Sequence, residues 1–179
     1  MFNTAVYVWL RDPQVTFDAN GGTVNIKTFQ AIYGSAFGAL PSPTRKGYTF
    51  SGWYTQKTGG TKITASTTVT QTEDITLYAR WKKVTTAKAS ISKVSSSKSG
   101  RLNITVKTVK GASGYQIICA TDKALKTNKK STIVSKNTAT VTGLKKGKTY
   151  YVKVRAFKTD STGGRVFGSY STVKTVKVK

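Results

Sequence analysis

The reactive side chains of this sequence are almost all basic. Thirty Lys and Arg stand against six Asp and Glu, with one Cys and no His, which gives a net charge of +24. The absence of His excludes imidazole relays and His-containing zinc sites. The single cysteine, Cys119, excludes an internal disulfide and any Cys-rich zinc site. With so few carboxylates, the composition indicates a protein that is not an enzyme and needs no metal or other cofactor.

The candidate site is a group of basic residues near the end of the sequence. A turn at residues 145–148 leads into a strand in which Lys153 and Arg155 share the outward face with Tyr151, because successive side chains of a strand alternate between its two faces. Lysines of residues 174–179 are expected on a neighbouring strand. The predicted basic face consists of Lys145, Lys146, Lys148, Lys153 and Arg155.

Three interpretations of this basic face compete. Exposed lysines keep a β-domain soluble and prevent edge-to-edge pairing of strands. The same charges would attract polyanions of the cell envelope or of host surfaces, with an affinity that falls as salt rises. Nucleic acid is the least favoured partner, because the sequence has no helix-turn-helix, zinc-finger or aromatic RNA-binding motif. Charge alone leaves a solvated coat and a polyanion site both open.

The elements that must position these residues are strands. The sequence has no sustained helical periodicity, and it alternates short runs of Val, Ile, Thr, Tyr and Phe with turns rich in Gly, Asn and Ser. No apolar run approaches the roughly 18 residues that a membrane-spanning helix needs. The predicted strands are residues 14–18, 27–33, 48–54, 75–81, 102–106, 115–120, 138–142, 150–157 and 173–178.

A break in charge predicts two domains. Residues 1–83 hold nine basic and four acidic side chains, a net of +5, whereas residues 84–179 hold twenty-one and two, a net of +19. The polar segment after Trp81 is typical of a linker. We therefore predict domains at residues 15–83 and 84–179.

Residues 1–14 form a third, short region. Val6-Tyr7-Val8 resembles Leu77-Tyr78-Ala79, and in both places a Trp and a basic residue follow closely. The region is thus interpreted as the remnant or closing strand of a preceding repeat. On so short a match, two unrelated aromatic strands remain an equal alternative.

Residues 15–81 contain motifs in a characteristic order. These are Asp18-Ala19-Asn20-Gly21-Gly22, Tyr33-Gly34, Pro41–Tyr48, Phe50–Tyr54, Gly59–Lys62 and Thr76–Trp81. In order and spacing they resemble the B-repeat of internalin-type surface proteins, also called the Listeria–Bacteroides repeat. The resemblance implies a small β-grasp-like fold that occurs in tandem on secreted or wall-attached bacterial proteins.

The large aromatic residues of this module are predicted to form its core. Strict alternation would place Phe50 and Trp53 on opposite faces, but a bulge at Gly52 would turn both rings inward. A module this small needs its largest side chains inside, so we expect Trp53 and Trp81 to be largely buried. The alternative is that they are exposed platforms for stacking sugars.

Residues 86–179 resemble a lysine-rich bacterial fibronectin type III domain. The similarity is carried by Gly114–Ile117, by Leu144–Ala156 and by the late Tyr170-Ser171. It implies an immunoglobulin-like β-sandwich in which Tyr150 takes the place of the tyrosine corner. The Trp usual near the end of the strand at residues 102–106 is missing, which suggests a thinner core. Cys119 is expected to be a buried, inert thiol, with pairing between chains as the alternative.

The sequence thus predicts a mainly β protein made of a β-grasp-like repeat followed by an immunoglobulin-like sandwich. The function it favours is that of a non-catalytic spacer or adhesion module of a secreted or cell-wall-attached bacterial surface protein, at a Gram-positive-type envelope. The expected partners are envelope polyanions, glycans or host surface proteins, and the modules are expected to be monomeric. The alternative is an accessory region of a secreted polysaccharide- or peptidoglycan-degrading enzyme whose catalytic domain lies outside this chain.

Overall fold

The computed structural model describes residues 11–179, and the chain divides into two compact units between Lys83 and Val84. The predicted remnant strand at residues 1–14 therefore falls mostly outside the described residues. The described part contains strands and no helix, so it holds none that is long and apolar enough to cross a membrane. The prediction of an all-β chain is confirmed.

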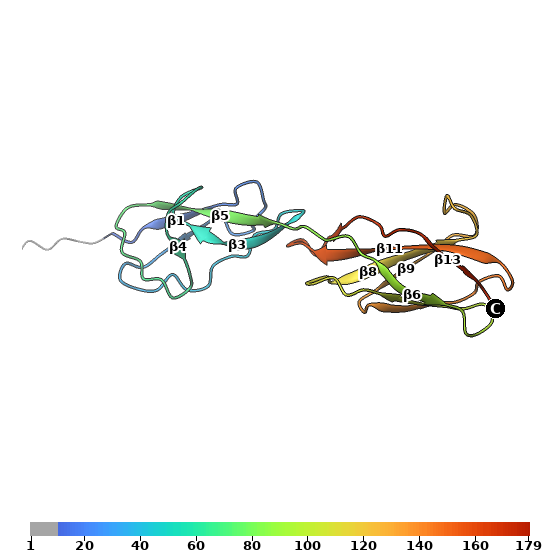
Figure 1. Ribbon diagram of the computed structural model, residues 1–179. Coiled ribbons are helices and arrows are strands. Elements are labelled where there is room, and N and C mark those ends of the chain that lie inside the picture. Colours follow the sequence, from blue (N-terminus) through green and yellow to red (C-terminus); the bar gives the residue numbers. More distant parts are fainter. Residues whose placement is uncertain (1–10) are drawn as a thin grey trace, which may run out of the picture. The chain divides into compact units, whose positions relative to one another are not determined.

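The first unit is a single mixed sheet (Figure 1). The strand order is β2-β1-β5-β3-β4, with β1 parallel to β5 and every other pair antiparallel. Two parallel strands at the centre of a five-stranded sheet in this order give the β-grasp arrangement, here without a helix. Its strands are β1 (Gln14–Asp18), β2 (Thr28–Gln30), β3 (Tyr48–Tyr54), β4 (Lys62–Ile63) and β5 (Ile75–Lys83).

The core of the first unit depends on a bulge in β3. The register between β3 and β5 shifts between Phe50 and Gly52, and Gly52 has a φ of 137°, which favours glycine. The rings of Phe50 and Trp53 consequently lie 5.5 Å apart, centroid to centroid. Trp53 is 1% exposed, and its Nε1 donates a hydrogen bond to the Pro41 carbonyl at 2.8 Å. The predicted bulge and the core position of Trp53 are both confirmed.

Trp81 is less buried than the sequence led us to expect. It is half-buried at the margin of the core, where its ring contacts Phe50 and its Nε1 donates to the Ala19 carbonyl at 2.9 Å. Gly22 allows this contact, because a Cβ there would lie 2.5 Å from a ring carbon of Trp81. Trp81 therefore fastens the turn that follows β1 and has little free face for a sugar.

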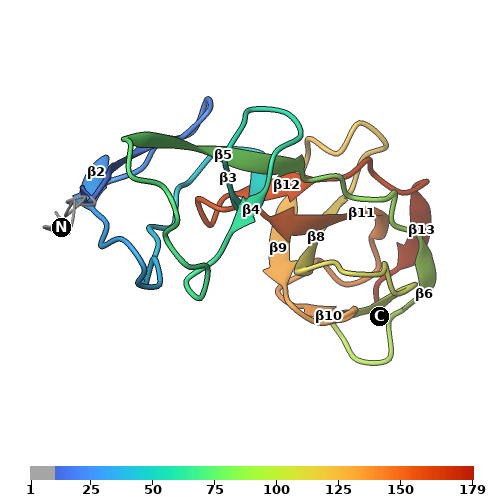
Figure 2. The ribbon, with the colours of Figure 1, turned by 90° about the vertical axis from the view of Figure 1, so that its left-hand side faces the viewer.

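The second unit is a sandwich of two antiparallel sheets (Figure 2). One sheet has the order β10-β7-β6; in the other, β8 lies between β9 and β11, and both β12 and β13 pair with β11. This is the strand arrangement of an immunoglobulin-like sandwich. The strands are β6 (Ile91–Ser95), β7 (Leu102–Val106), β8 (Gly114–Ala120), β9 (Lys130–Val134), β10 (Thr138–Val141), β11 (Thr149–Thr159), β12 (Arg165–Phe167) and β13 (Lys174–Lys177).

The core of the second unit follows the predicted alternation along β11. Tyr150, Val152, Val154 and Ala156 are all buried between the two sheets, whereas the residues between them are not. The Tyr150 hydroxyl accepts a hydrogen bond from the backbone N–H of Lys145 at 3.1 Å. This is the contact of a tyrosine corner, and it ties the turn before β11 to the core.

Candidate binding surface

The centre of β11 carries two of the predicted basic residues, Lys153 and Arg155. Both point away from the core, as alternation requires, but both are half-buried and neither extends freely into solvent. The Arg155 guanidinium lies 3.8 Å from the centroid of the Phe167 ring and 4.6 Å from that of Tyr170. Its Nε donates a hydrogen bond to Gln116 Oε1 at 2.7 Å. Arg155 is therefore held between two rings.

Lys153 extends the same stack. Its Nζ lies 4.1 Å from the centroid of the Tyr170 ring, and the Tyr170 hydroxyl donates to Gln116 Oε1 at 3.3 Å. Cation–π contacts of this kind stabilise the charged side chains in place. The two cations thus help to fasten the segment that contains Tyr170 onto the sheet. Alternation predicted their direction but not their structural role.

We expect Arg155→Gln to lower the free energy of unfolding of the second unit by about 1–2 kcal/mol, because the substitution removes two ring contacts and a charged hydrogen bond. Lys153→Gln, which loses one ring contact, should cost less than about 1 kcal/mol. Urea unfolding followed by far-ultraviolet circular dichroism measures both. Equal effects of the two substitutions would contradict the structural role of Arg155.

The other three predicted residues, Lys145, Lys146 and Lys148, lie in the turn at one end of the second unit. Gly147 has a φ of 74° and its N–H donates to the Val178 carbonyl at 2.8 Å. The N–H of Val178 donates in turn to the Lys148 carbonyl at 3.0 Å. The turn is therefore well fixed, while all three lysine side chains are exposed.

The five predicted residues fall into two groups along the chain. Lys148 comes one residue before β11 and five positions before Lys153, which is roughly 16 Å at the usual rise per residue of a strand. The lysine turn instead meets a loop that the sequence reasoning missed, residues 96–101. The Gly100 N–H donates to the Lys179 carbonyl and the Leu144 N–H donates to that of Gly100, at 3.0 and 3.1 Å.

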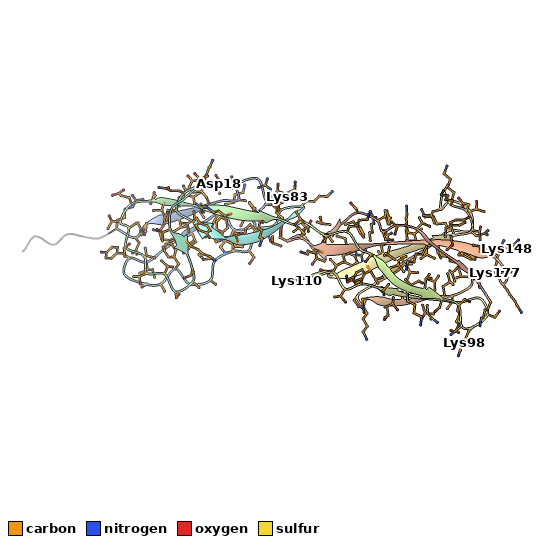
Figure 3. The ribbon with its side chains drawn as sticks, in the orientation of Figure 1. Asp18, Lys83, Lys98, Lys110, Lys148 and Lys177 are labelled. Atoms are coloured by element: carbon orange, nitrogen blue, oxygen red, sulfur yellow. The ribbon has the colours of Figure 1, made fainter. Side chains whose placement is uncertain are left out.

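We name the resulting surface the basic end. It is formed by the β6–β7 loop, the turn before β11 and the residues at the end of β13. In Figure 3 the labelled Lys98, Lys148 and Lys177 gather at this end of the unit, and Lys110 lies at the opposite end. The exposed cations of the basic end are Lys98, Arg101, Lys145, Lys146, Lys148, Lys177 and Lys179.

The carboxylates of the second unit are engaged in shaping loops. The half-buried Asp122 accepts hydrogen bonds from the backbone N–H groups of Lys126 and Thr127, and the bond from Thr127 is the main cause that lowers its pKa. The buried Asp160 accepts from Thr162 and from the Gly164 N–H at 2.9 Å. Among residues 11–179 no three His, Cys, Asp or Glu side chains lie close enough to hold a metal ion.

Cys119 is fully buried in the core of the second unit, as the sequence predicts for an inert thiol. Burial raises its pKa from 9.0 to about 11, since the thiolate is poorly solvated there. The unfolded thiol ionises first as pH rises, so its contribution to stability is complete below pH 9 and is lost between pH 9 and about 11.

The burial of Cys119 and its raised pKa each lead to an expected result. Ellman's reagent should react with Cys119 only after the second unit is unfolded in denaturant. The Cys119→Ala variant should also lose less stability than the parent protein between pH 9 and pH 11, measured by urea unfolding at each pH. Rapid reaction of the folded protein, or identical pH profiles, would show that the thiol is accessible.

A pocket of about 400 Å³ lies in the first unit, beside the half of β5 that β3 does not reach. It contains no Lys, Arg, Asp or Glu side chain, so it offers no acid–base pair or nucleophile with a basic partner. Its wall is mostly apolar and hydroxyl-bearing. The lining residues are Thr55, Ile63, Gln71, Ile75, Thr76, Leu77 and Tyr78.

The fold and the surface place this chain in the class of modular β proteins. Each of its two units has its own core, and the second unit is strongly basic. Residues 14–80 match the family model of the Listeria-Bacteroides repeat domain, so the predicted repeat is confirmed for the first unit. A segment of 40 residues is 58% identical to Internalin H of Listeria monocytogenes and covers 22% of this chain. It spans only 7% of that relative's length.

Solved structures similar to the chain are fibronectin type III domains. The FN5 domain of Drosophila Lar is 20% identical with a TM-score of 0.41, and the match covers 52% of this chain and 97% of that one. An Fn3-like protein from Clostridium thermocellum is 20% identical with a TM-score of 0.39, over 53% and 93% of the two chains. The sandwich assignment itself rests on the two sheets and the tyrosine corner described above.

Proposed function

We propose that this chain is a non-catalytic spacer or adhesion region of a modular bacterial surface protein. The observation that carries the proposal is the repeat match at residues 14–80, which coincides with a unit that has its own core. The similarity to Internalin H supports a place outside the cell, at an envelope of the Gram-positive type. Envelope polyanions, glycans or host surface proteins are the proposed partners, and the units act as monomers.

The absence of catalysis is part of this proposal. It is supported by the engagement of Asp122 and Asp160 in loop hydrogen bonds and by the pocket of the first unit, which has no charged lining. Incubation of the chain with purified cell walls and with soluble polysaccharides should release no reducing ends and no soluble peptidoglycan fragments. Turnover of either substrate would overturn the proposal.

A second candidate is an accessory region of a secreted polysaccharide- or peptidoglycan-degrading enzyme. The strongly basic second unit favours it, since such a surface would hold an enzyme on an anionic wall. The flanking coding sequence separates the two candidates. Further repeats and a wall-sorting signal would support the spacer, and an adjoining hydrolase domain would support the accessory region.

A further inference from the structure

We propose that the basic end of the second unit binds a linear acidic glycopolymer, one whose phosphodiester or sulfate groups repeat along a flexible backbone. This inference rests on the proposed function only in placing the chain outside the cell, where such polymers occur. It keeps the lysine turn of the basic face predicted from the sequence and omits Lys153 and Arg155, because aromatic rings hold those two side chains.

The first argument is convergence. Three segments that are distant in the sequence, residues 96–101, 142–148 and 174–179, are joined by backbone hydrogen bonds of 2.8–3.1 Å. The Lys179 N–H also donates to Ser96 Oγ at 3.0 Å. The side chains of the basic end are long and exposed, but the backbone that carries them is fixed. A fixed array of cations binds a polyanion with less loss of conformational entropy than a mobile tail does.

The second argument is the lack of compensation. The three segments contain eight Lys and Arg residues and no Asp or Glu. In the part of the chain that the structure describes, no acidic side chain forms an ion pair with any of the eight. Nearby, Lys130 Nζ lies 3.2 Å from the position that a Cβ on Gly143 would take, so the first residue of β9 adds a further cation. Clustered like charges raise the local potential and attract anions.

The third argument is contrast within the same unit. A pocket of about 250 Å³ beside β7 and β10 has no charged residue in its lining, which consists of Asn103, Ile104, Thr105, Thr138, Ala139 and Thr140. Exposed lysines also occur elsewhere on the unit, Lys93 beside Thr105 among them. At the basic end, by contrast, cations of three separate segments meet with no acidic residue among them.

The chemistry of the basic end selects the kind of polyanion. Lysine ammonium groups are compact charges with rotatable donors, which suit single phosphate or sulfate groups at varied spacing. The three segments contain no Phe, Tyr or Trp, so nucleobases would find no ring on which to stack. A flexible polymer without bases can instead pass from the exposed cations of one segment to those of the next.

The test uses the full chain and four probes at one ionic strength: a purified polyol-phosphate teichoic acid, heparin, neutral dextran and a duplex DNA of random sequence. One variant carries Lys145→Gln, Lys146→Gln and Lys148→Gln. The matched control carries Lys107→Gln, Lys110→Gln and Lys136→Gln, which removes the same charge from exposed residues at the opposite end of the unit. Unchanged thermal unfolding establishes that both variants fold.

We expect the chain to bind teichoic acid or heparin and not dextran, with an affinity that falls steeply with salt. The basic-end variant should lose about tenfold or more in affinity, and the control less than about twofold, since charges beyond a Debye length contribute little. Tighter binding to teichoic acid would identify a phosphodiester polymer as the ligand, and tighter binding to heparin would identify a sulfated one. If the basic-end variant unfolds, a double variant with Lys98→Gln and Lys177→Gln takes its place. It removes charge from the same surface at the other two segments, residues 96–101 and 174–179.

Three results would overturn the proposal: no binding to either acidic glycopolymer, equal loss in the two triple variants, or tighter binding to DNA than to both glycopolymers. None of them bears on the spacer role, which is tested separately by the release of fragments from cell walls and soluble polysaccharides. Fragment release with normal binding would refute the spacer role and leave the binding surface intact.

Discussion

Trp53→Ala is expected to unfold the first unit and leave the second folded. The substitution removes a fully buried indole, its contacts with Phe17 and Phe50, and its hydrogen bond to the Pro41 carbonyl. Loss of such a ring costs about 3–5 kcal/mol, which is a large part of the stability of a small module. Every Trp of the chain lies in residues 1–83, so the fluorescence of the two tryptophans that remain, Trp9 and Trp81, does not report on the second unit.

Trp81→Phe is the matched control for this experiment. Trp81 is half-buried, and phenylalanine keeps most of its contact with Phe50 while losing the hydrogen bond to Ala19. We expect a loss of about 1 kcal/mol, with a folded unit whose unfolding is followed through Trp53. A folded Trp53→Ala variant of normal stability would contradict the central place of Trp53 in the core.

Tyr150→Ala is expected to have the reciprocal effect and unfold the second unit. Tyr150 is 1% exposed at the centre of a core that shares no residue with that of the first unit. Its removal should cost about 3–5 kcal/mol. The far-ultraviolet signal of the sandwich should then be lost, while tryptophan fluorescence keeps the transition of the first unit.

Tyr150→Phe isolates the hydroxyl from the ring. The phenylalanine fills the same space but leaves the Lys145 N–H without its acceptor, which should cost about 1–3 kcal/mol. A loss of stability in both units after either substitution at Tyr150 would show that the two cores do not unfold independently. A Tyr150→Phe variant as stable as the parent would contradict the tyrosine corner.

The sequence was most informative where side-chain pattern and turn chemistry agreed. The strands at residues 14–18 and 102–106 have the predicted bounds, because each alternates cleanly between faces. The strand at residues 48–54 also has its predicted bounds, with the bulge at Gly52 that its glycine indicates. The turn after β1 contains an Asn-Gly pair, a combination that favours positive φ, and Asn20 and Gly21 have φ of 46° and 83°. The positive φ that glycine permits and the alternation of strand faces are both local properties, so a single sequence is enough to predict them.

Four strands were not predicted, for reasons of length and composition. β4 and β12 are only two and three residues long, which is too short for periodicity to appear. β6 and β9 are edge strands whose Lys and Ser residues hide the alternation. Their strand conformation depends on hydrogen bonds to a partner strand, and the local sequence pattern holds no information about that partner.

The candidate surface was predicted in part for the same reason. The lysine turn at residues 145–148 was visible as a run of charge, but its partner loop follows the unpredicted β6 and joins it only through long-range backbone hydrogen bonds. Arg155 was correctly placed on the outward face, yet the two rings that hold it come from residues 167 and 170. Such non-local contacts require the fold to be known.

The parallel pairing of β1 with β5 has a mechanical consequence. The chain enters the first unit through β1 and leaves it through β5, and the two strands are paired in register from Val15 with Ile75 to Asp18 with Tyr78. Tension along the chain would pull these neighbours in opposite directions along their length. The hydrogen bonds between them lie across the pull and would have to break together, not one after another. The first unit is therefore built to resist stretching.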